Sequence, residues 1–524
     1  MAYGKFTTVG KLFALRRKAL NEVDVFKYGK RSVARKFLTE LLDTPGQTKD
    51  AELQKKYMAG TTRKEVPSDL EGFWKYIEEE YLELEAEPSE KFTELAHMVH
   101  GDLASVGGLL KYIRLELGEL ERKKADLGRL TADERYYRNQ LEYFEKKNLQ
   151  ARDEIVDFMS NVIKSFAITK ATKQRLKFLN FGMSFFGDIP YAYGRKMAWS
   201  FSDPYDPRGL TIFSNKFMDL AVGSHRKIVD ECGDDSAKFK KFALPYINGI
   251  DDELPSVRVK IETLVAKSHL LSRRKRVIQS MLKHFEEKDY ISFVSMAPLQ
   301  IEGIFADICR EIGISEKELD ISSLNEKLSH IDGQVRSFFF FEYYSFKFPV
   351  LRNLVAHGGL IDGDLEDTAI HLLLDLLPVC ELTVSDDLPT INALKVLNEA
   401  GRGKPKELIS WLDLRKSVSI PDFYNVREKI AVAEGFYKSE EFWAHLTEEL
   451  KSVKTFDEIK NCEALKIAGK IKSNGLATEE AERFLKNSGK VARESIEKRD
   501  QMLEMFRQHM QPRKEKDGNE NSLN

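Results

Sequence analysis

The stretch "FPVLRNLVAHGG", residues 348–359, decides how this chain is interpreted. It is mostly apolar, yet it carries Arg352, Asn353 and His357 within six residues, and two glycines then end it. The apolar spacing predicts a helix, and Gly358 and Gly359 are a strong signal for its C-terminal end. A guanidinium, an amide and an imidazole are therefore expected together on one short helix, just where that helix stops.

Helical geometry arranges these three side chains. Asn353 and His357 are four residues apart and share one face of the helix, while Arg352 lies about 100° round but is long enough to reach that face. The buried stripe is expected to consist of Leu351, Leu354 and Val355. A histidine at the end of a helix can also have a purely structural role, by satisfying the last carbonyl groups.

The preceding segment predicts a second apolar helix. In "APLQIEGIFADICREIG" the apolar residues follow helical spacing, and Pro298 is suited to the first turn. Its predicted stripe comprises Ile301, Ile304, Phe305, Ile308 and Ile312. Glu302 lies at the edge of this stripe. A further helix is expected over "LNEKLSHIDGQV", and the helix after the glycines, "LEDTAIHLLLDLLPVCEL", is apolar almost all round and should be buried.

The aromatic run "SFFFFEYYSFKFP" lies between these segments, over residues 337–349. We expect a core or subunit-interface helix, because aromatic rings bury a large area and pack edge to face. A surface on which bases stack is the alternative, with Tyr343 or Tyr344 at the border of a site.

With these residues in place, "LRNLVAHG" following "PLQIEGIFADIC" resembles the HEPN superfamily (higher eukaryotes and prokaryotes nucleotide-binding), and is most similar to HEPN domains of bacterial phage-defence and abortive-infection proteins. The family motif is Arg, a polar residue, and His after four to six intervening residues, here Arg352, Asn353 and His357. The resemblance covers about residues 260–385. The resemblance implies a bundle of four or five helices that forms a dimer. In active members of the family it also implies a metal-independent endoribonuclease, in which the motifs of the two chains face each other across the dimer. Some members keep the fold without cleaving RNA.

The motif residues suit that chemistry. His357 can take or give a proton near neutral pH, and Arg352 can bind phosphate oxygens bidentately. Asn353 can hydrogen-bond phosphate, ribose or imidazole, and Glu302 can orient His357 or Arg352. One motif offers one imidazole, whereas a homodimer offers a base and an acid. The implied partners are an RNA substrate and a second copy, with no cofactor and no metal; a regulatory partner or phage trigger stays unspecified.

Other signals are weaker. A basic cluster that can hold an RNA backbone, or simply form a solvated helix face, comprises Arg273, Arg274, Lys275 and Arg276. His97 and His100 have helical i, i+3 spacing, but four zinc ligands are not evident and ordinary helix residues are the expected interpretation.

Composition indicates a globular protein. The 524 residues are 42% hydrophobic and 32% charged, with a formal net charge of −2. Residues 1–36 hold ten Lys or Arg and two acids, whereas residues 69–94 are acidic. This asymmetry fits either a polyanion-binding arm or two solvated helix faces that partly neutralise each other. We find no signal peptide, no run of about 18 apolar residues and no closely spaced cysteines in the sequence. We therefore expect a cytoplasmic protein without a membrane span.

The expected fold class is mainly α. A helical N-terminal region is expected over residues 1–184, with long helices after Pro88. An irregular connection rich in Gly, Pro and aromatics is expected over residues 185–256. The HEPN-like bundle is expected over residues 257–385. A C-terminal helical region over 386–510 and a disordered tail over 511–524 complete the chain. Two functions stay open: an RNase of the toxin or antiviral effector kind, and a non-catalytic helical module that binds RNA, nucleotide or a protein.

Overall fold

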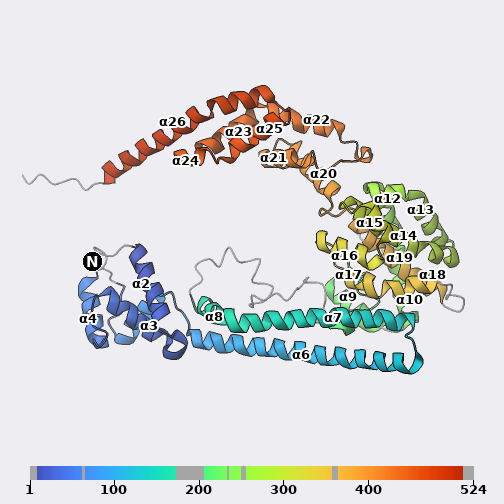
Figure 1. Cartoon of the computed structure of the whole chain (residues 1–524), viewed down its shortest axis with the longest axis horizontal. Helices are drawn as coiled ribbons and strands as arrows, with labels where there is room; N and C mark the ends of the chain where they lie inside the picture. The colour runs from blue at the N-terminus through green and yellow to red at the C-terminus, as the bar shows by residue number, and fades with distance from the viewer. Residues whose placement is uncertain are drawn as a thin grey trace, which may run out of the picture. The chain divides into compact units, whose positions relative to one another are not determined.

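The computed structural model describes residues 9–61, 65–172, 206–232, 235–249, 255–356 and 364–510. These residues form helices and no β-strand, apart from one isolated antiparallel bridge between Leu84 and Thr172 (Figure 1). The prediction of a mainly α chain is confirmed. The predicted tail, 511–524, lies outside the described residues. The chain divides into two compact units, Met1–Thr211 and Ile212–Asn524.

The first unit contains a small helical part and a long hairpin. Its elements are α2 (Val9–Glu22), α3 (Val25–Leu41), α4 (Asp50–Gly60), α5 (Leu70–Glu80), α6 (Pro88–Leu127), α7 (Ala132–Asp157), the π-helical turn Phe158–Val162, α8 (Ile163–Ala171) and the 3-10 turn Pro207–Gly209. The small part, α2 to α5, closes over a core with Phe37, Tyr57 and Trp74 at its centre.

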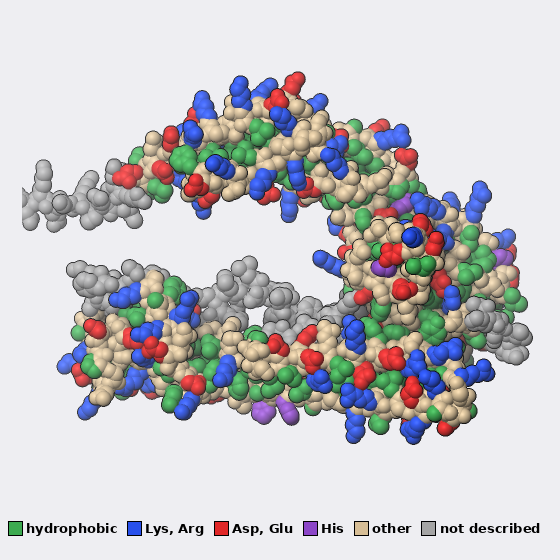
Figure 2. Space-filling model, viewed as in Figure 1, with side chains coloured by type: hydrophobic (Ala, Val, Ile, Leu, Met, Phe, Trp, Pro, Cys, Tyr) green, Lys and Arg blue, Asp and Glu red, His purple; other side chains and the backbone are tan. Residues whose placement is uncertain are grey.

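The basic N-terminal arm is neutralised within this unit. Arg16 pairs with Glu83 at 2.8 Å, and Arg31 pairs with Glu78 at 2.9 Å, while Lys30 reaches the same Glu78 carboxylate at 3.3 Å. The acidic segment thus supplies partners for the basic one. The interpretation as two helix faces that neutralise each other is the one that the structure supports, because these cations already have carboxylate partners. Figure 2 shows positive and negative side chains mixed over the visible surface.

The long hairpin confirms the expected helices after Pro88. α6 runs for 40 residues, about 60 Å at 1.5 Å per residue, and ends at Gly128 in the left-handed conformation that favours glycine (φ 72°). Thr131 and Glu134 form a capping box that starts α7. The short connection makes the two helices antiparallel, and they lie side by side in Figure 1. Their shared core includes Val99, Ile113, Leu141, Phe144 and Ile155.

The second unit begins with the helical bundle that carries the motif. Its elements are α9 (Val222–Cys232), α10 (Ser236–Asn248), α11 (Val257–Lys267), α12 (His269–Arg273), α13 (Lys275–Glu286), α14 (Tyr290–Glu311), α15 (Glu316–Ile321), α16 (Leu324–Gln334), α17 (Phe341–Phe346), α18 (Phe348–Ala356) and α19 (Leu365–Leu382). α14 contacts α13, α16, α18 and α19. The predicted stripe of α14 is confirmed for Ile301, Ile304, Phe305 and Ile308, all fully buried.

Two sequence predictions about this bundle are wrong. Pro298 is not at a first turn: α14 starts at Tyr290 and Pro298 lies buried in its interior, where packing of the apolar neighbours outweighs the lost backbone hydrogen bond. The region 185–256 is not irregular throughout, since α9 and α10 form within it and α10 packs on α11 and α19. Residues 185–205, 233–234 and 250–254 of that region lie outside the described residues.

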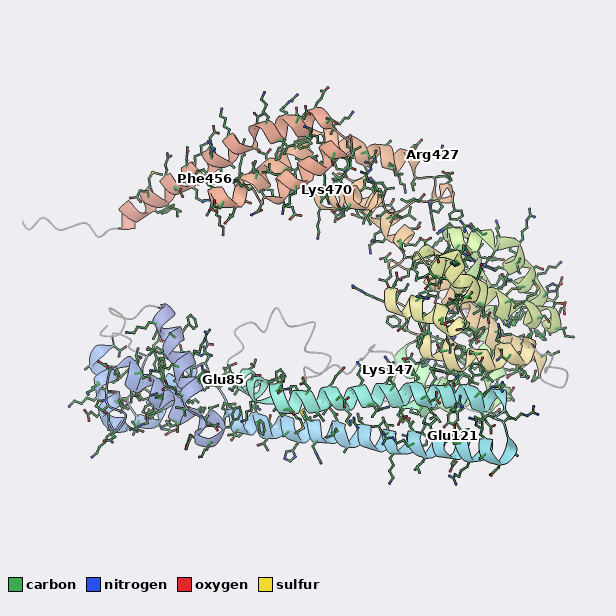
Figure 3. The ribbon with its side chains drawn as sticks, in the orientation of Figure 1. Glu85, Glu121, Lys147, Arg427, Phe456 and Lys470 are labelled. Carbon is green, nitrogen blue, oxygen red and sulfur yellow. The ribbon has the colours of Figure 1, made fainter. Side chains whose placement is uncertain are left out.

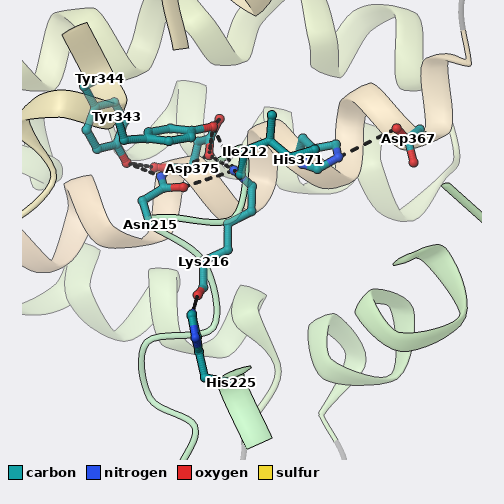
Figure 4. A network of polar contacts seen from close by, with 9 residues as sticks. All are labelled: Ile212, Asn215, Lys216, His225, Tyr343, Tyr344, Asp367, His371 and Asp375. Atoms are coloured by element: carbon teal, nitrogen blue, oxygen red, sulfur yellow. Dashed lines mark hydrogen bonds and ion pairs between the residues drawn. The ribbon is translucent and has the colours of Figure 1, made fainter. Parts of the chain in front are cut away.

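A buried polar network holds the start of this unit to the bundle (Figure 4). Lys216 Nζ lies 2.6 Å from Asp375 Oδ1, and both side chains have 0% exposure. Tyr343 OH donates to Asp375 at 2.9 Å, and Asn215 Nδ2 donates to the same carboxylate at 3.0 Å. Tyr344 OH donates to the Asp375 carbonyl at 2.7 Å. Burial lowers the pKa of the Lys216 ammonium, and the nearby Asp375 carboxylate acts against that shift.

The segment around Lys216 is held in an unusual backbone conformation. Phe217 has φ 58°, a left-handed value that bulky residues rarely adopt. Its ring packs edge-on against Phe242 and Tyr246, and the Lys216 ammonium also donates to the Ile212 carbonyl at 2.7 Å. These contacts fix the conformation of the segment.

We expect Lys216→Met to loosen the bundle, because it leaves the Asp375 carboxylate buried without its cation. Removing one partner of a buried ion pair costs about 3–5 kcal/mol. Hydrogen exchange of the α19 and α17 amides in the full chain measures the effect locally, and protection should fall in both helices.

The matched control is Arg427→Ala in the C-terminal region. Arg427 and its partner Asp422 are 88% and 87% exposed, and the Arg427 side chain lies at the edge of that region (Figure 3). An exposed ion pair contributes little, so protection of α19 should not change. Equal protection in Lys216→Met and wild type would contradict a structural role for the buried pair.

The described residues 389–510 are helical and have their own core. Its elements are α20 (Pro389–Ala400), α21 (Pro405–Leu414), the 3-10 turns Asp422–Tyr424 and Phe436–Lys438, α22 (Arg427–Gly435), α23 (Glu440–Lys451), α24 (Phe456–Ile459), α25 (Glu463–Ser473) and α26 (Thr478–Met510). Leu397, Trp411, Tyr437, Leu446 and Ile467 are buried together there.

Four residues join this region to the bundle. The buried His269 of α12 places Nε2 3.3 Å from Glu311 Oε2 at the end of α14. Tyr424 OH lies 3.2 Å from both Nδ1 and the backbone N–H of His269, and the Thr390 N–H donates to Glu311 at 3.0 Å. A neutral imidazole with its proton on Nε2 satisfies every one of these contacts.

This junction should weaken in acid. Burial alone raises the pKa of Glu311, but hydrogen bonds from His269 and Thr390 outweigh it and leave that pKa below its usual range. A carboxyl whose pKa is lower in the folded state stabilises the fold above its unfolded pKa, about 4.3, and this stabilisation is lost as the pH falls through the folded pKa. The protection factors of the amides at the start of α20, which correct for the intrinsic pH dependence of exchange, should therefore fall below about pH 4.

Glu311→Gln should flatten this pH dependence, whereas Glu441→Gln, at an exposed position of α23, should leave it as in wild type. Suppose that the start of α20 is equally protected from exchange at pH 7 and at a pH well below the ordinary carboxyl pKa. The role assigned to the Glu311 carboxylate would then be wrong.

Candidate functional site

Over its described residues the motif helix α18 forms as predicted, but it is more exposed than expected. Phe348 is fully buried at its start, whereas Leu351 and Val355 are only partly buried and Leu354 is 44% exposed. The predicted buried stripe is therefore wrong for Leu354. α18 lies at the surface of the bundle and is anchored by its first residues and by contact with α14, so its later apolar residues are not covered within the described chain.

Arg352 and Glu302 come together across the bundle. Arg352 Nη2 donates to Glu302 Oε2 at 3.2 Å, and Arg352 Nε lies 2.6 Å from Glu302 Oε1. The short Nε–Oε1 contact lacks hydrogen-bond alignment, so its contribution is that of an ion pair. Arg352 Nη1 donates to Asn353 Oδ1 at 2.9 Å. The prediction that Glu302 can orient Arg352 thus matches the observed geometry.

This group of three side chains is open to solvent on one side. The Arg352 side chain is 35% exposed and that of Glu302 is 23% exposed. The guanidinium is thus fixed by an acceptor on each side yet still reachable from outside. His357, Gly358 and Gly359 lie outside the described residues, and the structure assigns no position to the imidazole.

The predicted basic cluster divides into two kinds of residue. Arg274 is bound within the bundle: its Nε donates to Asp307 at 2.6 Å, and its other nitrogens donate to Gln300 Oε1 at 3.1 Å and to the Gly303 carbonyl at 2.9 Å. A Cβ on residue 303 would lie 2.4 Å from the guanidinium, so a larger residue there would force the end of the Arg274 side chain to shift. The other members, Arg273, Lys275 and Arg276, are exposed.

Arg274 and Arg352 approach the same turn of α14, one at Gly303 and the other at Glu302. The exposed basic residues beside Arg274 therefore lie in the neighbourhood of the motif, although about 80 residues separate them in sequence. Sequence reasoning proposed both groups but had no means to place them together.

The aromatic run is mostly core, as expected. Phe338, Tyr343, Tyr344, Phe346 and Phe348 are buried, and only Phe339 is as much as 45% exposed. Tyr343 and Tyr344 do not border an open site; they belong to the buried network around Asp375. Burial, and next the charge of Asp375, raise the pKa of both phenols far above its usual value.

Lys216 and Asn215 were not singled out from sequence. The available signal was Asp375 itself, a lone carboxylate in the otherwise apolar part of α19, which requires a buried partner. Its partner could not be chosen from the pattern, because Lys216 is 159 residues away.

No metal site is found among the described residues, which contain no group of three or more His, Cys, Asp or Glu that could hold an ion. His97 and His100 are exposed on α6. The four cysteines are free and buried.

One helix, α14, is long and apolar enough to cross a membrane by length and composition alone, a property missed in the sequence. Half of that segment is buried in the bundle, where α14 packs against α12, α13, α15, α16, α18 and α19, so the core position of α14 accounts for its apolar character.

Comparison with protein-family models, with curated proteins and with solved structures found no match for this chain.

We expect Arg274→Ala to destabilise the bundle by about 1–3 kcal/mol, because it removes one of the two cations, Arg274 and Arg310, that pair with the buried Asp307 carboxylate, together with the hydrogen bonds to Gln300 and Gly303. The neighbouring Arg273→Ala is the matched control, since Arg273 is exposed and has no such partner. In thermal unfolding of the full chain, the melting temperature of the bundle should be lower for Arg274→Ala and unchanged for Arg273→Ala. Equal stability of the two variants would mean that Arg274 is as available to a ligand as Arg273.

Proposed function

We propose that the bundle is a metal-independent endoribonuclease of the HEPN type, with Arg352, Asn353 and His357 as its catalytic residues. The observation that supports this most is the arrangement at Arg352, where Glu302 and Asn353 hold a solvent-accessible guanidinium on a surface helix. Two acceptors fix this guanidinium while its side chain stays 35% exposed, so it can bind a phosphate that approaches from solvent.

The proposed reaction is attack of a ribose 2′-OH on the adjacent phosphate. His357 takes the proton from the 2′-OH or gives one to the leaving 5′-oxygen. Arg352 binds non-bridging phosphate oxygens and stabilises the charge that develops on them. Asn353 positions the phosphate, the ribose or the imidazole, and Glu302 keeps the guanidinium in its orientation.

Arg352→Ala and His357→Ala should each abolish cleavage of total RNA, because both groups act on the phosphate. General acid–base catalysis alone supplies roughly 10²–10⁴-fold. Cleavage by wild type should persist in EDTA, since the proposed steps use imidazole and guanidinium groups. Asn325→Ala, at a partly exposed position of α16, serves as a control that should keep full activity.

Two results would overturn this proposal. One is unchanged cleavage by a folded His357→Ala protein. The other is cleavage that is lost in EDTA and restored by magnesium. A chain that binds RNA without cutting it would instead favour the non-catalytic binding module. A role as toxin or antiviral effector is part of the proposal and follows from the resemblance; growth arrest on expression, absent in His357→Ala, is its test.

A two-fold dimer would complete this site, because one imidazole cannot serve as base and acid on opposite sides of one phosphate. The aromatic run was expected to supply the dimer surface, but its rings are largely buried in their own chain. Exposed apolar residues nearer the motif are better placed: Leu299, 60% exposed, is one turn before Glu302, and Leu354 is two residues after Arg352. Both flank the ion pair.

Sedimentation of the full chain should therefore show a dimer, and Leu299→Glu should convert it to a monomer and lower cleavage, because a carboxylate would be buried at the interface. Ile321→Glu is the control, since Ile321 is 85% exposed on another helix. A strict monomer that cleaves RNA at the full rate would show that the site is complete in one chain.

A further inference from the structure

A run of positive charge lies where α12 meets α13. Residues 263–285 contain six Lys or Arg and no Asp or Glu, although the chain as a whole has a formal net charge of −2. Three of these cations, Arg273, Lys275 and Arg276, lie within four consecutive residues at the junction of the two helices, and all three are exposed. We call these three residues the basic corner.

No carboxylate balances the basic corner. Among the described residues, none of its three side chains forms an ion pair or a hydrogen bond, whereas Arg258 on the neighbouring α11 pairs with both Glu262 and Glu286. The first turn of α13 has no acidic residue, so the positive end of its helix dipole adds to these charges. A surface of unbalanced positive charge attracts a polyanion.

Arg274, which lies between Arg273 and Lys275 in the sequence, fixes the basic corner beside the motif. Its guanidinium donates to the Gly303 carbonyl at 2.9 Å, and Arg352 donates to the adjacent Glu302 at 3.2 Å. The Arg274 side chain is 23% exposed and that of Arg352 is 35% exposed, so both reach the surface. The basic corner and the motif therefore meet at one turn of α14.

The surface between Arg274 and Arg352 is open to a strand. Successive residues of a helix point about 100° apart, so the two arginines approach α14 from adjacent sides. Ala306 lies between these two directions by helical spacing, and it is small and partly exposed. Leu299 lies one turn of α14 the other way from Glu302, so a strand that crosses at Ala306 leaves the proposed dimer surface free.

We infer that the basic corner binds the backbone of an RNA strand whose cleaved phosphate lies at Arg352, a few nucleotides away along the same strand. This rests on the proposed function and adds the surface that holds the rest of the substrate. Because Glu302 balances Arg352, the net positive charge that draws a polyanion comes from the corner. Its three residues are positioning residues: they hold phosphates and take no part in proton transfer.

The first test measures binding by the full chain carrying His357→Ala, so that RNA stays intact. Arg273→Gln, Lys275→Gln and Arg276→Gln are combined in that background. The probe is a fluorescein-labelled single-stranded oligouridylate of about 16 nucleotides, the upper end of the usual site sizes, followed by anisotropy over a series of salt concentrations. The three changes should weaken binding and reduce the slope of log K against log salt by about 2, because each phosphate contact contributes about 0.7.

A matched control removes the same charges elsewhere. Arg483, Lys486 and Arg493 on α26 are also two arginines and one lysine, are exposed, and pair with no carboxylate among the described residues. Acidic residues of the same helix surround them, so Arg483→Gln, Lys486→Gln and Arg493→Gln together should leave the salt slope unchanged. Both triple variants should melt at the temperature of the parent, because the replaced side chains are exposed and unpaired.

The second test measures cleavage with His357 in place. Loss of the basic corner should raise KM for the long oligouridylate several-fold and leave kcat unchanged, because the corner acts on binding alone. For a uridine dinucleotide, which is too short to reach the corner, kcat/KM should stay as in wild type. An equal loss on both substrates would mean that the corner acts through the structure of the site, and this inference would be wrong.

The outcomes separate this inference from the function on which it rests. If wild type cleaves RNA and the corner variant binds with unchanged affinity and slope, only the role of the corner is wrong. The same holds if its three changes abolish cosedimentation with phosphatidylserine vesicles and leave RNA binding unchanged, since the corner would then bind a membrane. If wild type cleaves neither substrate but the slope falls as expected, the proposed function is wrong and the corner still binds RNA.

Discussion

The buried ion pair between Lys216 and Asp375 is the interaction on which the motif-bearing bundle depends. Two charged groups without solvent are stable only when every remaining donor and acceptor around them is satisfied. Here Asn215, Tyr343 and Tyr344 provide those contacts, which join the start of the second unit, α17 and α19. α18 follows α17 directly, so the same network that satisfies one carboxylate also sets where Arg352 lies.

α14 links this network to the rest of the second unit. Its middle carries Glu302 and Gly303, which receive Arg352 and Arg274, and its last residue, Glu311, receives His269 and the start of α20. About 13 Å of helix separates the two groups of contacts. A change in how the C-terminal region is seated on Glu311 would thus act on the same rigid helix that holds Arg352, which gives the flanking region a physical route to the site.

Charge pairing explains why a chain of near-zero net charge can still offer a local anion site. In the first unit the basic arm meets the acidic segment, and around the motif the arginines meet carboxylates on α14. What remains available is local: the exposed basic residues Arg273, Lys275 and Arg276 beside Arg274. Attraction for a polyanion depends on these few residues and not on the total charge.

The sequence by itself determined the helical class, the long helices after Pro88, the stripe of α14 and the burial of α19, because each follows from the 3.6-residue period of apolar side chains along one segment. It also indicated Arg352, Asn353 and Glu302 as a possible group. Only the tertiary structure decided that Lys216 is the partner of Asp375, that Arg274 is bound to α14, that Leu354 faces solvent, and that α14 continues through Pro298. Those outcomes depend on which distant segments pack together, and the period of a single helix contains no information about the partner that covers it.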